Sequence, residues 1–306
     1  MLCVLSGGTG TCKLLQGLKK VERFTVIINT GEDVWVSGNK LCPDVDSVLY
    51  SLADIIDTEK WWGVKDDTFV THSRLKDLGF DEGLAIGDMD RAVHIARSDL
   101  LRKGHTLTQA VRSIQDQLGI EAELLPMCED DVLTYIITPQ GEMHFQEFWV
   151  KHKGEPDVLD VAIKGANRAE ATPEAINSIR DSDAVMIGPS NPITSVMPIL
   201  SVNGIKKELE EKKVIAISPI IGKKAFSGPA AKLMAAKGYE VSPTGVADCY
   251  QDFLDILVVD EADKELEGYY GDIKVVSAPT IMKNRDDAVQ LAEYISTLST
   301  AHRRTD

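Results

Sequence analysis

Small and hydroxyl-bearing residues directly follow the first apolar run of the chain. Ser6–Thr11 reads Ser-Gly-Gly-Thr-Gly-Thr and comes just before leucines at helical spacing. Small side chains at a strand-to-helix turn let backbone N–H groups approach a phosphate at the helix N-terminus. Cys12 and Lys13 stand where a Walker A loop and a complete G-x-G-x-x-G motif need glycine. The segment predicts a phosphate or nucleotide cradle, with an ordinary tight turn as the alternative.

Acidic residues follow at two places. Asn29–Asp33 (Asn-Thr-Gly-Glu-Asp) ends the second apolar run, and Pro43–Ser47 places Asp44 and Asp46 two residues apart before a helical pattern. Such carboxylates suit a hard cation such as Mg²⁺, or ribose hydroxyls at the end of a strand. Asp46 could equally be the N-cap of the helix, so both interpretations stay open.

Two further segments could bear on a ligand. Gly87–Arg91 is an acidic loop before a helix with His94, for which a general-base role and a structural role are both open. The adjacent Trp61 and Trp62 could stack on a planar ring, or divide between core and surface. The histidines lack the spacing of a zinc hydrolase.

The second half of the chain repeats the pattern of strand and polar loop. Gly188–Ser195 follows one β-branched run, Ser218–Gly222 follows the next, and Ser227–Pro229 opens a helix. If the strands are parallel, these loops meet at one sheet edge, which favours a nucleotide or diphosphate cleft.

The elements that must position these loops alternate between short apolar runs and amphipathic stretches. We expect strands at Leu2–Leu5, Thr25–Ile28, Ala184–Ile187, Val214–Ile217 and Ile256–Val259, with helices at Ile205–Glu211, Pro229–Ala236 and after Asn284. This alternation predicts an α/β fold with a mostly parallel sheet and covering helices.

The middle of the chain differs. Pro43–Leu118 has helical periodicity, and Leu133–Ile137 with Met143–Phe148 predicts a β-hairpin. We therefore expect a single α/β domain over residues 1–306 with a largely helical insertion at about 43–120.

Charge and cysteine content restrict the partners and the compartment. Lys and Arg number 33 against 48 Asp and Glu, a net charge of −15, which argues against nucleic acid and anionic membranes. Five scattered cysteines without a C-x-x-C pair favour a reducing compartment. Because no signal peptide or bilayer-length apolar run occurs, we expect a cytoplasmic protein.

Taken in order, the segments resemble the 2-phospho-L-lactate transferase family of coenzyme F-420 biosynthesis over nearly the whole chain. The matching segments are Leu5–Gly10, Asn29–Asp33, Cys42–Tyr50, Gly87–Asp90 with His94, His144–Glu147, Gly188–Ser195 and Ser218–Gly222. The resemblance implies a Rossmann-like sheet with helices on both faces and a Mg²⁺-dependent enzyme. In the family, the ribityl hydroxyl of the deazaflavin Fo attacks lactyl-2-diphospho-5'-guanosine, releasing GMP and forming coenzyme F-420-0.

The resemblance also implies roles for individual residues. Asp46 matches the aspartate of the deazaflavin and metal site, so that Asp46 and Asp44 would be catalytic and Glu32, Asp44 and Asp46 would hold the metal. Ala85 stands where relatives can carry a basic residue facing Fo, Met89 is often basic in relatives, and Glu32 is often Asp. The nucleotide side would be formed by Gly7, Gly8, Thr9, Gly10, Ser190, Asn191 and Ser195.

Alternatives remain from other classes. A non-catalytic nucleotide-sugar-binding regulator of the gluconeogenesis-factor-like type would share the early glycine loop, whereas a nicotinamide-dependent dehydrogenase needs the glycine that Lys13 replaces. The carboxylates of Pro43–Ser47 and the Trp61-Trp62 pair favour the transferase. The sequence leaves open whether the donor carries lactate, phosphoglycerate or phosphoenolpyruvate, and a homodimer is the commonest expectation.

Overall fold

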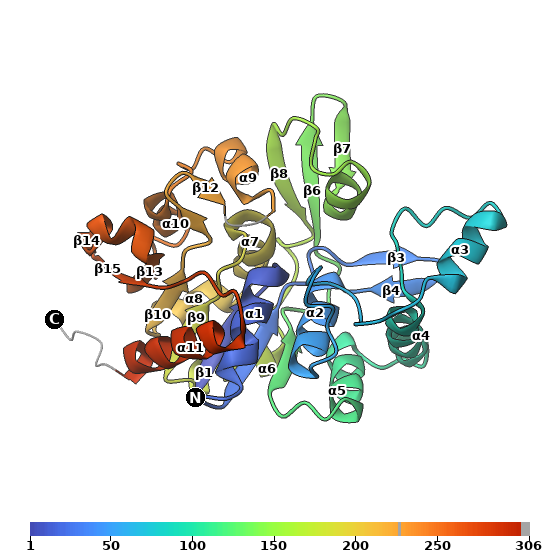
Figure 1. Cartoon of the computed structure of the whole chain (residues 1–306), viewed down its shortest axis with the longest axis horizontal. Coiled ribbons are helices and arrows are strands. Elements are labelled where there is room, and N and C mark those ends of the chain that lie inside the picture. The colour runs from blue at the N-terminus through green and yellow to red at the C-terminus, as the bar shows by residue number, and fades with distance from the viewer. Residues whose placement is uncertain (226–227, 301–306) are drawn as a thin grey trace.

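The chain folds around one large sheet. The computed structural model describes residues 1–225 and 228–300 (Figure 1). The strands of this sheet are β1 (Leu2–Ser6), β2 (Phe24–Ile28), β5 (Glu123–Pro126), β9 (Ala184–Ile187), β10 (Val214–Ile217), β13 (Ile256–Asp260), β14 (Gly268–Tyr270) and β15 (Ile273–Ala278). Their order is β14-β15-β13-β10-β9-β1-β2-β5, with β14 antiparallel to β15 and the other pairs parallel.

Apolar side chains on both faces of the sheet require helices on both faces. In β1, Leu2 and Val4 join one hydrophobic core and Cys3 and Leu5 join the other, as alternation along a strand dictates. The first core is covered by α1 (Gly8–Leu18), α2 (Pro43–Leu52), α5 (Leu107–Gln117) and α11 (Arg285–Thr300). The second is covered by α6 (Pro173–Asp181), α7 (Met197–Ser201), α8 (Ile205–Glu210), α9 (Ala230–Ala236) and α10 (Pro243–Asp248).

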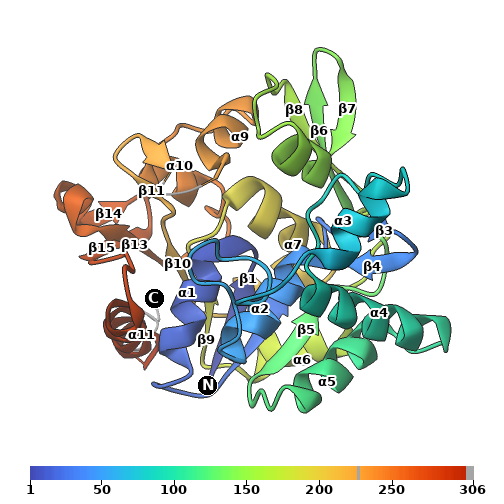
Figure 2. The same ribbon diagram turned by 45° about the vertical axis from the view of Figure 1, so that its right-hand side comes forward.

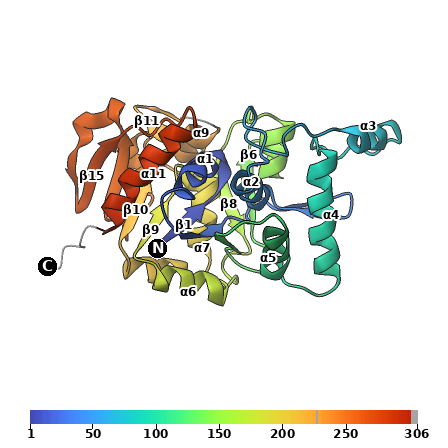
Figure 3. The same ribbon diagram turned by 60° about the horizontal axis from the view of Figure 1, so that its bottom comes forward.

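Figure 3 shows this layering, with α1 and α11 on one side of the sheet and α6 on the other. The predicted α/β fold with a mostly parallel sheet is therefore confirmed. β5, β14 and β15 are strands of the sheet that the sequence reasoning did not predict.

A second sheet stands beside the carboxyl ends of the parallel strands. It contains β6 (Leu133–Thr138), β7 (Gly141–His144) and β8 (Asp160–Lys164) in the order β7-β6-β8, all antiparallel. The predicted hairpin is present, but its second strand ends at His144 and not at Phe148. Glu147–Lys151 instead forms a π-helix, η1. The ring centroids of Phe145 and Phe148 lie 6.4 Å apart.

The predicted helical segment also contains long irregular stretches. The hairpin of β3 (Val34–Val36) and β4 (Asn39–Leu41) lies beside α3 (Val70–Asp77) and α4 (Asp88–Arg102), and these form the arm that Figure 2 brings forward. Residues 53–69 and 78–87 are mostly turns and loops, so the segment is less helical than expected. The division into one domain with an insertion stays a prediction.

The remaining elements are short. They are η2 (Pro192–Val196), β11 (Ile220–Ile221), β12 (Lys224–Ala225) and η3 (Glu261–Leu266). Ser227, part of the third predicted polar loop, lies outside the described residues. Within the described ranges no helix has the length and apolar character needed to cross a bilayer.

Candidate active site

A cavity of about 700 Å³ opens where several of the predicted segments meet. β1 leads into the first turn of α1 and β9 leads into residues 188–195, so the carboxyl ends of two adjacent parallel strands deliver both loops to one edge. The predicted residues that line the cavity are Gly8, Thr9, Gly10, Glu32, Asp44, Asp46, Ala85, Ser190, Asn191 and Ser195. Gly7 is the N-cap of α1 and lies behind this lining.

The glycines allow the two loops to pack against each other. A Cβ on Gly10 would lie 2.0 Å from the carbonyl oxygen of Pro189, and one on Gly7 would lie 2.6 Å from the Cβ of Ser195. The hydroxyls of Thr11 and Ser190 are 2.6 Å apart, and Ser190 also donates to the carbonyl oxygen of Gly7. The glycine-rich segment therefore builds the cavity wall by close backbone packing, and the Ser190 hydroxyl fastens the two loops together.

We expect Gly10→Ala to disrupt this packing. The added methyl group overlaps a backbone oxygen that cannot rotate away, so the free energy of unfolding falls by about 1–3 kcal/mol. Urea denaturation measures the loss, and Thr9→Ser in the same helical turn is the control because it adds no atom there. Wild-type stability in Gly10→Ala would contradict the close approach of the two loops.

A carboxylate already occupies part of the helix N-terminus. The Gly8 N–H donates to Asp44 Oδ1 at 2.7 Å, and the Asn29 side chain donates to Asp44 Oδ2 at 2.8 Å. First-turn N–H groups have no acceptor inside a helix, which leaves those of Thr9 and Gly10 at the cavity wall as donors for a ligand.

Asp44 and Glu32 form a pair of buried acids. Burial raises the pKa of Asp44 to about 6, although the hydrogen bonds from Asn29 and Gly8 oppose the shift. Burial, followed by repulsion from Asp44 and Asp33, raises the pKa of Glu32 well above its usual value, and Gln146 donates to Glu32 Oε2 at 3.1 Å. Neither acid has an ion-pair partner among the described residues. Two negative charges are therefore costly at this pair unless a cation or a proton compensates them.

Asp46 points elsewhere, because residues two apart on a helix do not share a face. α2 begins at Pro43 with Cys42 as N-cap, so the alternative interpretation of Asp46 as N-cap is wrong. The Asp46 carboxylate accepts from both terminal nitrogens of Arg97, from His94 Nε2 at 3.2 Å and from the Cys42 N–H at 3.3 Å. Burial opposes ionisation, but Arg97 and His94 outweigh it and lower the pKa of Asp46 to about 2.

α4 supplies the partners of Asp46 on one face. Asp90, His94 and Arg97 are spaced as i, i+4 and i+7, and His94 Nε2 lies 3.1 Å from Asp90 Oδ1. Burial alone would lower the pKa of His94, but hydrogen bonds to Asp46 and Asp90 raise it to about 9. Sequence reasoning missed Arg97, although its helical spacing from His94 was a usable signal.

The charges of Asp46, Asp90, His94 and Arg97 balance one another without a metal ion. Oxygen and nitrogen atoms of Asp46, Asp90 and His94 lie within 4.8 Å of one another and could surround a cation. Arg97 and the protonated His94 already match the two carboxylates in charge. The joint metal set of Glu32, Asp44 and Asp46 stays a prediction, and the geometry separates Asp46 from the other two.

Aromatic side chains form another wall of the cavity. Trp61 and Trp62 both line it, with the Lys13 ammonium 4.9 Å from the Trp61 ring and the Lys60 ammonium 5.4 Å from the Trp62 ring. Trp149 of η1 also faces the cavity, and no motif in the sequence had indicated it. The wall offers flat apolar surface for a planar ring.

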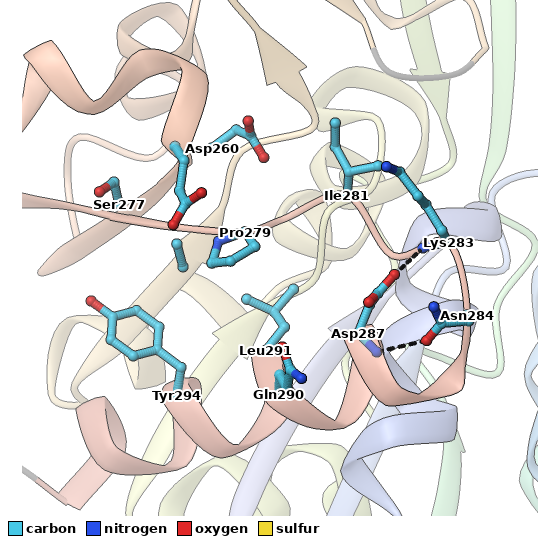
Figure 4. A pocket seen from close by; sticks show the side chains of 12 residues that line it. Asp260, Ser277, Pro279, Ile281, Lys283, Asn284, Asp287, Gln290, Leu291 and Tyr294 are labelled. Atoms are coloured by element: carbon cyan, nitrogen blue, oxygen red, sulfur yellow. Dashed lines mark hydrogen bonds between the residues drawn. The ribbon is translucent and has the colours of Figure 1, made fainter.

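A second cavity, of about 540 Å³, lies near the start of α11 (Figure 4). Two of its carboxylates already bind neighbouring groups: Asp260 accepts from the N–H and hydroxyl of Thr280, and Asp287 accepts from the Lys283 N–H. The Asp287 N–H in turn donates to Asn284. These bonds cap the helix and close its entry loop, so we place the candidate active site in the larger cavity.

The fold and the larger cavity place the chain among open-sheet α/β proteins whose ligand sites lie outside the carboxyl ends of the strands. The family model described as "2-phospho-L-lactate transferase CofD" matches residues 2–292, and the chain belongs to that family. Ala85 and Asp46, which the resemblance assigns to one side of the site, line the same cavity as the residues assigned to the nucleotide side.

Individual relatives agree with the family. Proteins named 2-phospho-L-lactate transferase are 51% identical over 302 residues in Methanocaldococcus jannaschii and 48% identical over 299 residues in Methanococcoides burtonii. The alignments cover 96% of this chain and 97% and 98% of those proteins. A crystal structure of a UPF0052 family protein from Bacillus halodurans matches with a TM-score of 0.65 at 16% identity, covering 96% of this chain and 98% of that one, which shows the shared fold alone.

Proposed function

We propose that this chain is a Mg²⁺-dependent transferase that moves a 2-phospholactyl group from lactyl-2-diphospho-5'-guanosine to the ribityl hydroxyl of Fo. The products are GMP and coenzyme F-420-0. The observation that carries the proposal is one cavity lined by the first turn of α1, the 188–195 loop, a carboxylate pair without an ion-pair partner among the described residues and an aromatic wall. Membership of the 2-phospho-L-lactate transferase family supports the same group transfer.

On the nucleotide side, Asn191 of the cavity lining carries a hydrogen-bond donor that has no partner among the described residues. Asn191 Oδ1 accepts from the Ile193 N–H, but Asn191 Nδ2 is buried without a partner among the described residues. A buried donor left unpaired costs free energy, which a phosphate or guanine oxygen would recover. With the N–H groups of Thr9 and Gly10 and the hydroxyl of Ser195, Asn191 would hold the guanosine diphosphate part of the donor.

On the acceptor side, Asp46 is suited to orient a hydroxyl. Its pKa of about 2 makes it a weak proton acceptor, but Oδ1 accepts from Arg97 alone among the described residues and can accept a further hydrogen bond. Trp61 and Trp62 would contact the deazaflavin ring, and Ala85 at the cavity wall would contact it without a charge.

The residues present fit a hard divalent cation. Glu32 and Asp44 supply carboxylate oxygens; burial raises the pKa of both, and repulsion from Asp44 adds to the shift of Glu32, effects that a cation would relieve. We therefore propose Glu32 and Asp44 as the main metal ligands. Asp46 would contribute less, because its carboxylate is already paired with Arg97. When bound, Mg²⁺ would neutralise charge on the diphosphate and on the departing GMP.

The transfer forms one P–O bond and breaks another. The acceptor hydroxyl oxygen bonds to the lactate-side phosphorus, the bond from that phosphorus to the GMP oxygen breaks, and the hydroxyl proton leaves to bulk water. The chain contributes mainly position: the two loops fix the donor, Asp46 orients the hydroxyl, and the aromatic wall keeps the acceptor ring in place.

Binding of Fo tests the acceptor side. We expect micromolar protein to quench Fo fluorescence, and Trp62→Leu to weaken the binding about tenfold or more, because ring stacking is lost. Trp35→Leu is the matched control, since Trp35 is 54% exposed on β3 and does not line the cavity. Absence of quenching by the wild type would contradict the proposed acceptor.

The regulator alternative predicts nucleotide binding without turnover, and the relatives named as transferases favour the enzyme. A homodimer and a cytoplasmic location accompany the proposal as expectations.

A further inference from the structure

The cavity is poor in positive charge for an anionic substrate. Four acids line it, Glu32, Asp44, Asp46 and Asp90. Among the described lining residues the cationic side chains are Lys60, His94 and Lys153. Lys60 pairs with Asp57 at 2.7 Å, and His94 is shared between Asp46 and Asp90. Lys153 has neither an ion pair nor a hydrogen bond from its ammonium group within residues 1–225 and 228–300.

The backbone holds Lys153 in an unusual conformation. Its φ is 52°, in the left-handed region that costs a non-glycine residue roughly 1–2 kcal/mol. The turn is fixed on both sides, because the Gly154 N–H donates to the Phe148 carbonyl at 2.9 Å and Lys232 of α9 donates to the carbonyls of Gly154 and Glu155 at 3.0 Å. The fold therefore maintains a strained turn that places Lys153 in the cavity lining.

The position of this turn favours the donor over the acceptor. α9, which holds the turn through Lys232, packs against η2 at Pro192–Val196, part of the loop with Asn191 and Ser195. Trp61 and Trp62 come from the separate loop between α2 and α3. Lys153 thus belongs with the elements that form the anion side of the cavity.

We propose that Lys153 is a specificity residue that binds an anionic group, a phosphate or a carboxylate, of the guanylated donor; this rests on the proposed function. A single ammonium provides the positive charge that the acid-rich cavity otherwise lacks on this side. Fo carries neither a phosphate nor a carboxylate, so we expect its binding not to depend on Lys153.

The test compares three variants in steady-state kinetics. Lys153→Asn keeps the left-handed turn, which asparagine tolerates, and removes the charge. We expect it to raise the KM for the donor about tenfold, as loss of one charge-assisted hydrogen bond predicts, and to leave the KM for Fo unchanged. Lys153→Arg should restore most of the affinity. Lys151→Asn is the matched control, because Lys151 pairs with Glu147 and does not line the cavity.

Calorimetric binding separates this inference from the proposed function. If the wild type yields no GMP, the proposed function fails, while weaker binding of the donor by Lys153→Asn still supports Lys153. Weaker binding of GDP would assign the contact to the diphosphate, and unchanged GDP binding with weaker donor binding would assign it to the carboxylate. Unchanged donor KM and affinity in Lys153→Asn, or an equal effect of Lys151→Asn, would overturn the inference.

Discussion

Asp46→Asn is expected to lower the free energy of unfolding by about 3–5 kcal/mol, because it leaves the Arg97 guanidinium buried without its counter-charge. Arg97 is fully buried, and its pKa stays raised through the neighbouring carboxylate despite the opposing effect of burial. Transferase activity should decrease because less of the protein is folded, so Asp46→Asn alone cannot separate a catalytic role from a structural one. Urea denaturation monitored by circular dichroism measures the loss.

A double variant separates the two roles. Asp46→Leu with Arg97→Met replaces the ion pair by apolar side chains of similar size, which should recover much of the stability. Activity should stay lost, because the Asp46 oxygen that orients the acceptor is gone. Full stability in Asp46→Asn would contradict the buried ion pair, and activity in the double variant would contradict the role in orientation.

The same cluster gives the wild type a defined pH range of stability. Asp46 has a folded pKa of about 2, below its ordinary 3.8, so its contribution is present above pH 4 and is lost as pH falls towards 2. His94 has a folded pKa of about 9, above its ordinary 6.5, so its contribution is complete below pH 6.5 and is lost as pH rises through 9. Urea denaturation at a series of pH values measures both limits.

Asp44→Asn is expected to reduce transferase activity at least about 100-fold while leaving the fold intact. The substitution removes one of the two uncompensated carboxylates at the cavity wall. It also removes a buried charge, which offsets the mismatch between the new amide and the donors of Asn29 and Gly8, so we expect stability to change by less than about 2 kcal/mol.

Thermal unfolding with added Mg²⁺ provides the control for this variant. Ligands that bind only the folded state raise the melting temperature, so Mg²⁺ should stabilise the wild type and should stabilise Asp44→Asn much less. Asp88→Asn is a matched acidic control, because Asp88 caps the start of α3 through Val70 and Thr71 and does not line the cavity. Wild-type turnover in Asp44→Asn would exclude Asp44 as a metal ligand.

Local patterns predicted the parts of the site that belong to strand ends. The runs ending at Leu5 and Ile187 are short, continuous and apolar, so the loops that follow them could be assigned to one sheet edge from the sequence alone. The proposed substrates came from the family resemblance alone, because the hydrophobic pattern of a sequence does not indicate which molecules the protein binds.

Tertiary packing decided what the sequence could not show. Asp44 and Asp46 look equivalent in the sequence, but they point in different directions from α2. Asp44 accepts hydrogen bonds from Gly8 and Asn29. Asp46 accepts from Arg97, which lies 51 residues further along the chain. Trp149 comes directly after a predicted strand and Lys153 four residues later, and both line the cavity because the π-helix η1 replaces the end of that strand. The close approach of Gly10 to Pro189 is likewise a contact between distant segments.

The most direct measurement of the central claim is product formation by the purified wild-type protein. With Mg²⁺, Fo and lactyl-2-diphospho-5'-guanosine, we predict that GMP and coenzyme F-420-0 accumulate in equal amounts, and that chelating the metal stops both. Binding of the guanylated donor without GMP or phosphodiester would contradict the transferase and would favour the non-catalytic regulator.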